Sequence, residues 1–312
     1  MTFTSGTSRR TLLTSVAAAA AGLPLIGDLT GNAPAAAAAT TTEPASNAVL
    51  YSKAEYQEGV HWMRRFRTHP RPELTDNLRH ATEPVRSTAV LAPHGGGIEA
   101  GTSELCLAIA GYVLLAEDEA GTVTPEQAVV PGVPQRDYWM FEGLASSSEL
   151  HVTSTHCDDP AALAVCSRNL YAVSLHGFAP KPDSPESAVS DKQILIGGRD
   201  QRLMRNLAAS FAAHGLTADH TDPARRVAVT VAAPNSALNG DDPANIVNRT
   251  ATGAGAQLEI STALRRAMFG DFSGAPARRR TAGSGTEPAH FWNAFVGAVR
   301  QAVDRHERGL AA

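Results

Sequence analysis

An apolar run ends in a glycine-rich turn that carries two residues able to bind a metal or move a proton, His94 and Glu99. The run before the turn, Thr88–Ala92, is short and partly β-branched, as a buried strand is. A strand that ends in a flexible turn places polar side chains at the edge of an α/β sheet, where ligands and catalytic groups gather. We therefore expect the chemistry of this protein at the turn.

Two further polar residues belong to other predicted strands: His176 ends one, and Glu259 lies within another. Two imidazoles and one carboxylate that converge from separate strands can hold zinc and leave a fourth position open for water. The glycines at 95–97 would let the backbone turn sharply enough for His94 and Glu99 to face one ion. A helical His-Glu-x-x-His motif is absent, so the common metalloprotease arrangement is not expected.

Other interpretations of the same residues stay open at this point. A histidine at a strand end often only binds a backbone group, and the Gly95–Thr102 turn could hold phosphate at the N-terminus of the following helix. His151 and His156 are equally open to a structural or a functional role. The remaining histidines are typical of surface or core positions: His61, His69, His80, His214, His220, His290 and His306.

Strand and helix patterns alternate through the chain, which predicts an α/β domain with an open, mainly parallel or mixed twisted sheet and helices on both faces. The predicted strands are Val60–Thr68, Thr88–Ala92, Asp137–Glu142, Glu149–Ser154, Tyr171–Gly177, Gln193–Gly198, Arg226–Val231 and Ala256–Ser261. The predicted helices are Leu105–Leu115, Pro160–Cys166, one from Asp200 to Gly215 and one that begins near Thr286.

The N-terminus has the order of an export signal. Arg9 and Arg10 precede an alanine-rich apolar stretch and a small-residue run, Ala35–Ala39, as in a twin-arginine signal peptide. The apolar part is too short and too rich in small residues for a stable membrane span. We expect a signal peptide over residues 1–39, a disordered leader over 40–47 and a single zinc hydrolase domain over 48–312.

Charge and cysteine content limit the partners of the exported chain. Without residues 1–39, 25 basic and 30 acidic residues remain, a formal charge of −5. This balance, without a basic and aromatic pattern, argues against nucleic acid as a partner. The three cysteines match no zinc motif; Cys106 is expected to be buried, and a Cys157–Cys166 bridge is open to an exported protein but is not favoured.

Five short blocks, in order, resemble the poly-γ-glutamate hydrolase family, which includes phage-borne enzymes and bacterial relatives once labelled phage-related replication proteins. The blocks are His-Gly-Gly-Gly-Ile-Glu-Ala-Gly-Thr-Ser-Glu-Leu (94–105), Leu-His-Val-Thr-Ser-Thr-His (150–156), Ser-Leu-His-Gly (174–177), Leu-Ile-Gly-Gly (195–198) and Gln-Leu-Glu-Ile-Ser (257–261). The resemblance covers roughly Leu91–Arg265, and five ordered blocks are more specific than any one of them.

The resemblance implies a carboxypeptidase-like open α/β fold with one catalytic zinc that hydrolyses γ-glutamyl amide bonds. It implies His94, Glu99 and His176 as zinc ligands and Glu259 as the catalytic carboxylate. Arg249 and Arg265 are our candidates to bind substrate carboxylates, because both lie near Glu259 in the sequence and arginine binds carboxylates in a bidentate manner.

The natural substrate stays open, because an acidic chain repels a polyanion at long range. Arg278–Arg280 could supply local positive charge, although a solvated loop is the interpretation favoured there. The leading hypothesis is an exported, monomeric zinc amidohydrolase that acts on poly-γ-glutamate or related γ-glutamyl peptides, with no membrane partner after signal cleavage. The alternatives are a zinc peptidase or amidase that cleaves peptidoglycan stem peptides and a secreted, non-catalytic binding protein of the same fold.

Overall fold

The structure is a computed structural model that describes residues 43–69, 87–114, 129–144, 148–181, 184–234 and 236–309. The expected signal peptide, residues 40–42 of the expected leader and the segment 70–86 lie outside the described residues. Residues 43–47, which we assigned to the disordered leader, have defined contacts instead. The Ser46 side chain caps helix α1 (Asn47–Tyr51), and Asn47 is buried. The folded domain therefore begins before Ala48.

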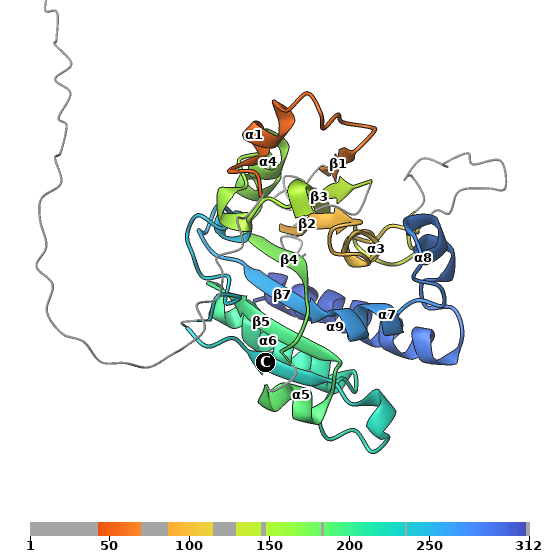
Figure 1. Ribbon diagram of the computed structural model, residues 1–312. Coiled ribbons are helices and arrows are strands. Elements are labelled where there is room, and N and C mark those ends of the chain that lie inside the picture. The colour runs from red at the N-terminus through yellow and green to blue at the C-terminus, as the bar shows by residue number, and fades with distance from the viewer. Residues whose placement is uncertain are drawn as a thin grey trace, which may run out of the picture. The chain divides into compact units, whose positions relative to one another are not determined.

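The described residues form one seven-stranded sheet in the order β1-β3-β2-β4-β7-β5-β6 (Figure 1). The strands are β1 (Trp62–Arg67), β2 (Thr88–Gly96), β3 (Asp137–Gly143), β4 (Tyr171–Phe178), β5 (Gln193–Gly198), β6 (Ala228–Val231) and β7 (Ala256–Ser261). The four central strands β3, β2, β4 and β7 are parallel, while β1 pairs antiparallel to β3, β5 pairs antiparallel to β7, and β6 runs parallel to β5. The open mixed sheet that we predicted is confirmed.

Alternate residues of the central strands enter two separate cores, because successive side chains of a strand point to opposite faces. Val90 of β2 belongs to the larger core, whereas Ala89 and Leu91 belong to the smaller one. Both faces are therefore apolar, which explains why these strands are nearly continuous apolar runs in the sequence.

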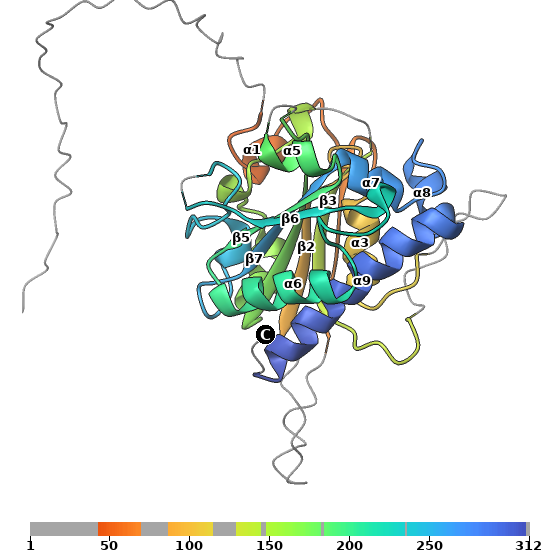
Figure 2. The same cartoon turned by 90° about the horizontal axis from the view of Figure 1, so that it is seen from below.

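Helices cover both faces of the sheet. Those that supply buried residues to the larger core include α3 (Thr102–Ile109), α6 (Gln201–Ala213), α7 (Thr262–Ala267) and α9 (Thr286–Glu307), and those of the smaller core include α1 and α4 (Pro160–Ser167). Helices α6 and α9 lie side by side beneath the sheet (Figure 2). Two short helices, α5 (Pro185–Val189) and α8 (Ala275–Thr281), complete the set in the described residues, together with the 3-10 turns η1 (Ser148–Leu150), η2 (Ser154–His156), η3 (Pro223–Arg225) and η4 (Ile246–Asn248).

The order of the strands creates a switch point between β2 and β4. The chain goes from β2 to its neighbour β3, and then passes to the other side of β2 to form β4. Helices α3 and α4, which follow β2 and β3, pack in different cores and so lie on opposite faces. In open α/β sheets, ligands bind outside the carboxyl ends of the strands at such a point. The ends of β2 and β4 are therefore where a site is expected.

Several local predictions were wrong. The expected strand Glu149–Ser154 is instead η1 and the approach to η2, where the Val152 carbonyl accepts a hydrogen bond from His94 Nε2. The helix expected to end at Leu115 ends at Ile109, before Gly111 with its φ of 92°. Residues 278–280 form part of helix α8 and not a loop.

The cysteines and the helices settle two further points. All three cysteines are free and buried, so Cys157 and Cys166 form no bridge, and Cys106 is buried as expected. In the part of the chain that the structure describes, no helix combines the length and the apolarity needed to cross a membrane.

Candidate active site

A bulge in β2 sets the direction of His94. Ala92 pairs with Met140 and Gly95 with Glu142, so three steps along β2 match two steps along β3. One extra residue reverses the alternation of side chains, and bulges commonly redirect a functional side chain in this way. Pro93 falls within the bulge, where its missing N–H removes no regular ladder bond. With regular alternation, His94 would point into the larger core, as Val90 and Ala92 do. The bulge turns it toward the site on the opposite face.

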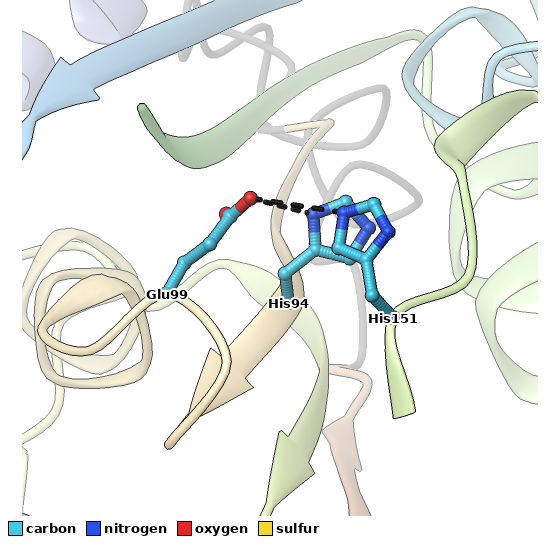
Figure 3. Close-up of side chains that lie close together, drawn as sticks. All are labelled: His94, Glu99 and His151. Carbon is cyan, nitrogen blue, oxygen red and sulfur yellow. Dashed lines mark hydrogen bonds and ion pairs between the residues drawn. The ribbon is translucent and has the colours of Figure 1, made fainter. Parts of the chain in front are cut away.

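The turn after β2 returns Glu99 to His94, as the glycine pattern predicted. The Glu99 amide donates to the His94 carbonyl oxygen at 2.7 Å, and His94 Nδ1 lies 3.0 Å from Glu99 Oε1 (Figure 3). Gly96 has a φ of 67°, and a Cβ there would lie 2.3 Å from the carbonyl oxygen of Gly143. Only glycine fits this close approach, so the turn depends on it.

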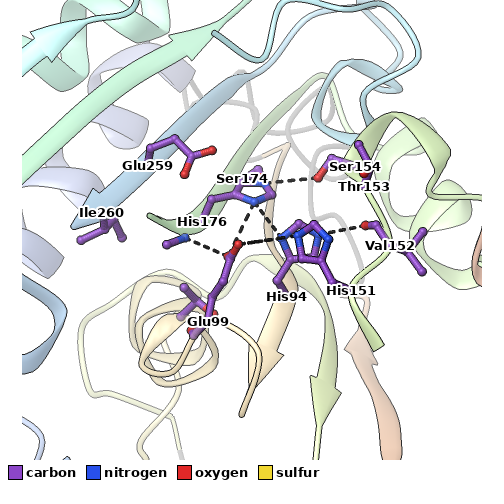
Figure 4. Close-up of polar contacts among 12 residues, drawn as sticks. His94, Glu99, His151, Val152, Thr153, Ser154, Ser174, His176, Glu259 and Ile260 are labelled. Carbon is purple, nitrogen blue, oxygen red and sulfur yellow. Dashed lines mark hydrogen bonds and ion pairs between the residues drawn. The ribbon is translucent and has the colours of Figure 1, made fainter. Parts of the chain in front are cut away.

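Parallel pairing of β4 with β7 places His176 directly opposite Glu259. Both side chains point to the face of the sheet that carries the smaller core. Ser174 and Gln257 occupy the preceding pair of positions on that face, so a polar row replaces apolar packing at this end of the strands. Figure 4 shows His94, Glu99, His176 and Glu259 gathered around one region at the ends of β2, β4 and β7.

The two imidazoles turn the same kind of nitrogen inward. His94 Nδ1 and His176 Nδ1 lie 3.1 Å apart, and His176 Nδ1 lies 3.7 Å from Glu99 Oε2. The outer nitrogens already have oxygen partners: His94 Nε2 donates to the Val152 carbonyl at 2.9 Å, and His176 Nε2 lies 2.7 Å from Ser174 Oγ. Such outer contacts fix the tautomer and orientation of metal-binding histidines. The donor set of two Nδ1 atoms and one carboxylate fits a zinc ion.

The electrostatics of the site favour a cation between these groups. Burial raises the pKa of Glu99, but the charge and hydrogen bond of His94 outweigh burial and bring it to about 2. Burial lowers the pKa of His94, yet Glu99 raises it above the ordinary value overall. Burial lowers the pKa of His176 to about 3, which keeps this ring neutral. A proton and a metal ion therefore compete for the His94 ring.

Glu259 has the opposite electrostatic character to Glu99. Burial is the main reason that its pKa rises to about 8, and the negative charge of Glu99 adds to the effect. Gln257 Nε2 donates to Glu259 Oε1 at 2.9 Å and fixes the carboxyl group. Two nearby carboxyl groups with pKa values displaced in opposite directions are typical of a site that divides charge stabilisation from proton transfer.

His151 is a fourth side chain at the site, whose role the sequence left open. Its ring lies against that of His94, with centroids 3.9 Å apart, and its Nε2 is 4.0 Å from Glu99 Oε1. His94, Glu99 and His151 offer atoms close enough to hold one ion. On its outer side, His151 Nδ1 lies 3.1 Å from Glu43, a contact that no sequence signal indicated. The only sequence hint for His151 was its place in the 150–156 block.

The two predicted substrate-binding arginines lie in different surroundings. Arg265 is buried and donates to the carbonyl oxygens of Ile260 and Ala100 and to the Thr262 hydroxyl. Its charge lowers the pKa of Glu259, so it acts on the site even though these donors are engaged. Arg249 is exposed and directly follows η4, which packs against η2 near the site. A substrate contact stays a prediction for both.

The model of the family described as poly-gamma-glutamate hydrolase matches residues 70–118 and 119–294 of this chain. These segments cover more than half of the sequence and include every residue placed at the site except Glu43. The chain belongs to the poly-γ-glutamate hydrolase family. The resemblance stated from the five sequence blocks is thereby confirmed.

Relatives of this chain occur in Bacillus subtilis (strain 168). The SPbeta prophage-derived UPF0714 protein YoqZ is 32% identical over 194 residues, which is 62% of this chain and 55% of YoqZ. The UPF0714 protein YndL is 35% identical over 191 residues, which is 59% of this chain and 57% of YndL. The match thus spans little more than half the length of these relatives.

Two solved structures share the fold. A bacteriophage poly-gamma-glutamate hydrolase superposes with a TM-score of 0.57 at 28% identity, over 84% of this chain and 96% of that structure. A zinc-free apo form of YndL superposes with a TM-score of 0.52 at 26% identity, over 78% of this chain and 92% of that structure. The carboxypeptidase-like α/β architecture is therefore common to this chain and the two solved structures.

Proposed function

We propose that this chain is an exported, zinc-dependent amidohydrolase that cleaves γ-glutamyl amide bonds of poly-γ-glutamate or related γ-glutamyl peptides. The observation that carries the proposal is the convergence of His94 Nδ1, His176 Nδ1 and the Glu99 carboxylate, with both outer imidazole nitrogens held by oxygen atoms. The membership of the chain in a hydrolase family supports the same conclusion.

His94, Glu99 and His176 would hold the metal. A zinc ion bound there supplies Lewis acidity, which makes water more acidic and stabilises negative charge that develops on the amide oxygen. His151 lies outside this set in the proposal, because its Nδ1 faces Glu43 and its Nε2 is farther from Glu99 than is the His176 nitrogen. Its ring, tilted by 35° against that of His94, would instead close one side of the site.

Glu259 would transfer the protons of the reaction. Its carboxylate would take a proton from the attacking water and give it to the leaving nitrogen. A bond then forms between the water oxygen and the γ-carbonyl carbon, the amide C–N bond breaks, and a carboxylate and an amine result. The hydrogen bond from Gln257 keeps the carboxylate oriented, and because burial raises its pKa to about 8, a cation bound nearby would favour its ionised form.

Metal analysis and mass spectrometry of poly-γ-glutamate digests test the proposal. The purified chain should contain about one zinc per molecule and release glutamate oligomers. His94→Ala should lose both the metal and the activity, whereas Glu259→Gln should keep the metal and lose the activity. Release of muropeptides without glutamate oligomers would instead favour a peptidoglycan substrate, and full activity of Glu259→Gln would refute the catalytic assignment.

Export is a separate part of the proposal, and it rests on the paired Arg9 and Arg10 before the apolar stretch. Replacing both residues by lysine should leave the protein inside the cell if a twin-arginine pathway carries it. Secretion of the double variant at the level of the original chain would contradict this route.

A further inference from the structure

A pocket of about 790 Å³ lies on the far side of the turn that joins His94 to Glu99. Gly96, Gly97 and Ala100 of this turn line one wall. The other walls come from β1, the end of β3, helix α7 and helix α8. Its volume is in the range of pockets that hold small ligands. We call it the arginine pocket, after the four arginines that line it: Arg65, Arg266, Arg278 and Arg279.

Among the described residues, more arginines than carboxylates line the pocket. Glu142 pairs with Arg65 at 3.2 Å and with Arg279 at 3.5 Å. Arg278 pairs with Glu104 at 3.0 Å, and Glu142 is the one carboxylate among the described residues that line the pocket. The pocket therefore attracts anions locally, although the chain as a whole is acidic.

Two of the arginines have unused binding capacity. Arg266 is exposed, and among the described residues no carboxylate pairs with it; its guanidinium carbon lies 5.5 Å from the centre of the Phe272 ring. Arg279 Nε is buried and has no hydrogen-bond partner within the described part of the chain. A planar guanidinium can bind a carboxylate in a bidentate manner, because two parallel N–H groups match its two oxygens.

Apolar side chains alternate with these charges on the walls of the pocket. Met63, Leu144 and Phe272 lie among the arginines. A chain of γ-linked glutamate has the same mixed character, since each unit presents two methylene groups in the backbone and one free α-carboxylate. A phosphate or sulfate ion would use only the charges and leave the apolar walls without a partner.

The turn that separates the pocket from the proposed zinc site also links the two through hydrogen bonds. Arg278 donates to the Gly96 carbonyl oxygen at 3.1 Å and pairs with Glu104 at 3.0 Å, so the pocket wall braces the turn that carries Glu99. Arg265 donates to the carbonyl oxygen of Ala100 at 2.7 Å from the other side. The segment 96–100 therefore lines the pocket and also carries Glu99 of the proposed zinc site.

We propose that the arginine pocket is a binding subsite for the α-carboxylates of γ-glutamyl units away from the bond that is cleaved. This inference rests on the proposed function for the identity of the ligand. It adds a second binding region, and it makes Arg266 and Arg279 determinants of specificity for long, anionic chains over short peptides.

Binding to the metal-free protein tests the pocket without any hydrolysis. The probe is a short, fluorescently labelled oligomer of γ-linked glutamate, and the readout is fluorescence anisotropy. Arg266→Gln should raise the Kd roughly three- to tenfold, the loss expected for one charge-assisted carboxylate contact. Arg280→Gln is the matched control, because Arg280 is an exposed arginine of α8 that does not line the pocket. It should change the Kd less than about twofold.

Kinetics of the zinc-loaded enzyme give the second readout. Arg266→Gln and Arg279→Gln should raise KM for the polymer by a similar factor and leave kcat unchanged, while both constants for a γ-glutamyl dipeptide stay as they are. Unchanged Kd and polymer KM in both variants, with hydrolysis intact, would overturn the pocket assignment. Displacement of the oligomer by an equal concentration of inorganic phosphate would overturn it as well, because the pocket would then be a general anion site. Weakened oligomer binding in a protein that hydrolyses no γ-glutamyl bond would support the pocket and refute the proposed function.

Discussion

The buried carboxyl group of Glu259 makes the stability of the metal-free protein depend on pH in a way that one substitution removes. Its pKa is raised from 4.5 to about 8, mainly by burial. Between these values the folded protein holds a proton that the unfolded chain releases, so the free energy of unfolding falls as the pH rises through this window. At about 1.4 kcal/mol per pH unit, the full loss is at most about 5 kcal/mol.

Glu259→Gln replaces the carboxyl group with a neutral group of the same shape. The side-chain oxygen of the glutamine can still accept the hydrogen bond from Gln257. The variant should match the original chain near pH 5 and be more stable by up to about 5 kcal/mol near pH 9. Glu99 and His176 titrate in both proteins, so their contributions largely cancel in the difference between the two.

Urea unfolding of the metal-free proteins, followed by circular dichroism at several pH values, measures this difference. Glu55→Gln, at an exposed position, controls for the loss of a carboxylate as such. A difference between Glu259→Gln and the original chain that stays constant from about pH 5 to about pH 9 would refute the account, because it would mean that burial does not displace this pKa.

Three further outcomes follow from the same contacts. His176→Gln should bind zinc at least tenfold more weakly than His151→Gln, as measured by competition with a chelator. The reverse order would mean that His151, and not His176, is the zinc ligand. Zinc affinity should fall as the pH drops, because the raised pKa of His94 lets a proton compete with the metal for this ring. Calorimetry in buffers of different ionisation enthalpy should detect proton release on binding, and its absence would contradict this competition. Arg278→Met should destabilise the protein by about 3–5 kcal/mol in urea unfolding, since it leaves Glu104 buried without its partner, and a loss below about 1 kcal/mol would show that the pair is not needed.

The sequence alone determined most of the parallel strands and the type of sheet, and it predicted the residues of the candidate site. Apolar runs with turns after them are local features, and so are the glycines that bring Glu99 back to His94. The five ordered blocks identified the family, because residue types in a fixed order carry more information than any single motif. Strand ends that carry histidine also indicated where a ligand should bind.

Only the tertiary structure decided how those residues face one another. The direction of His94 depends on a bulge, which is a matter of register between β2 and β3; Pro93 is compatible with a bulge but does not fix the register. Alignment of His176 with Glu259 depends in the same way on the pairing of β4 with β7. The contact of His151 with Glu43 joins segments more than a hundred residues apart. Arg278 is buried against Glu104 for the same reason, which is that long-range packing and not local propensity selects the partner of a charged group.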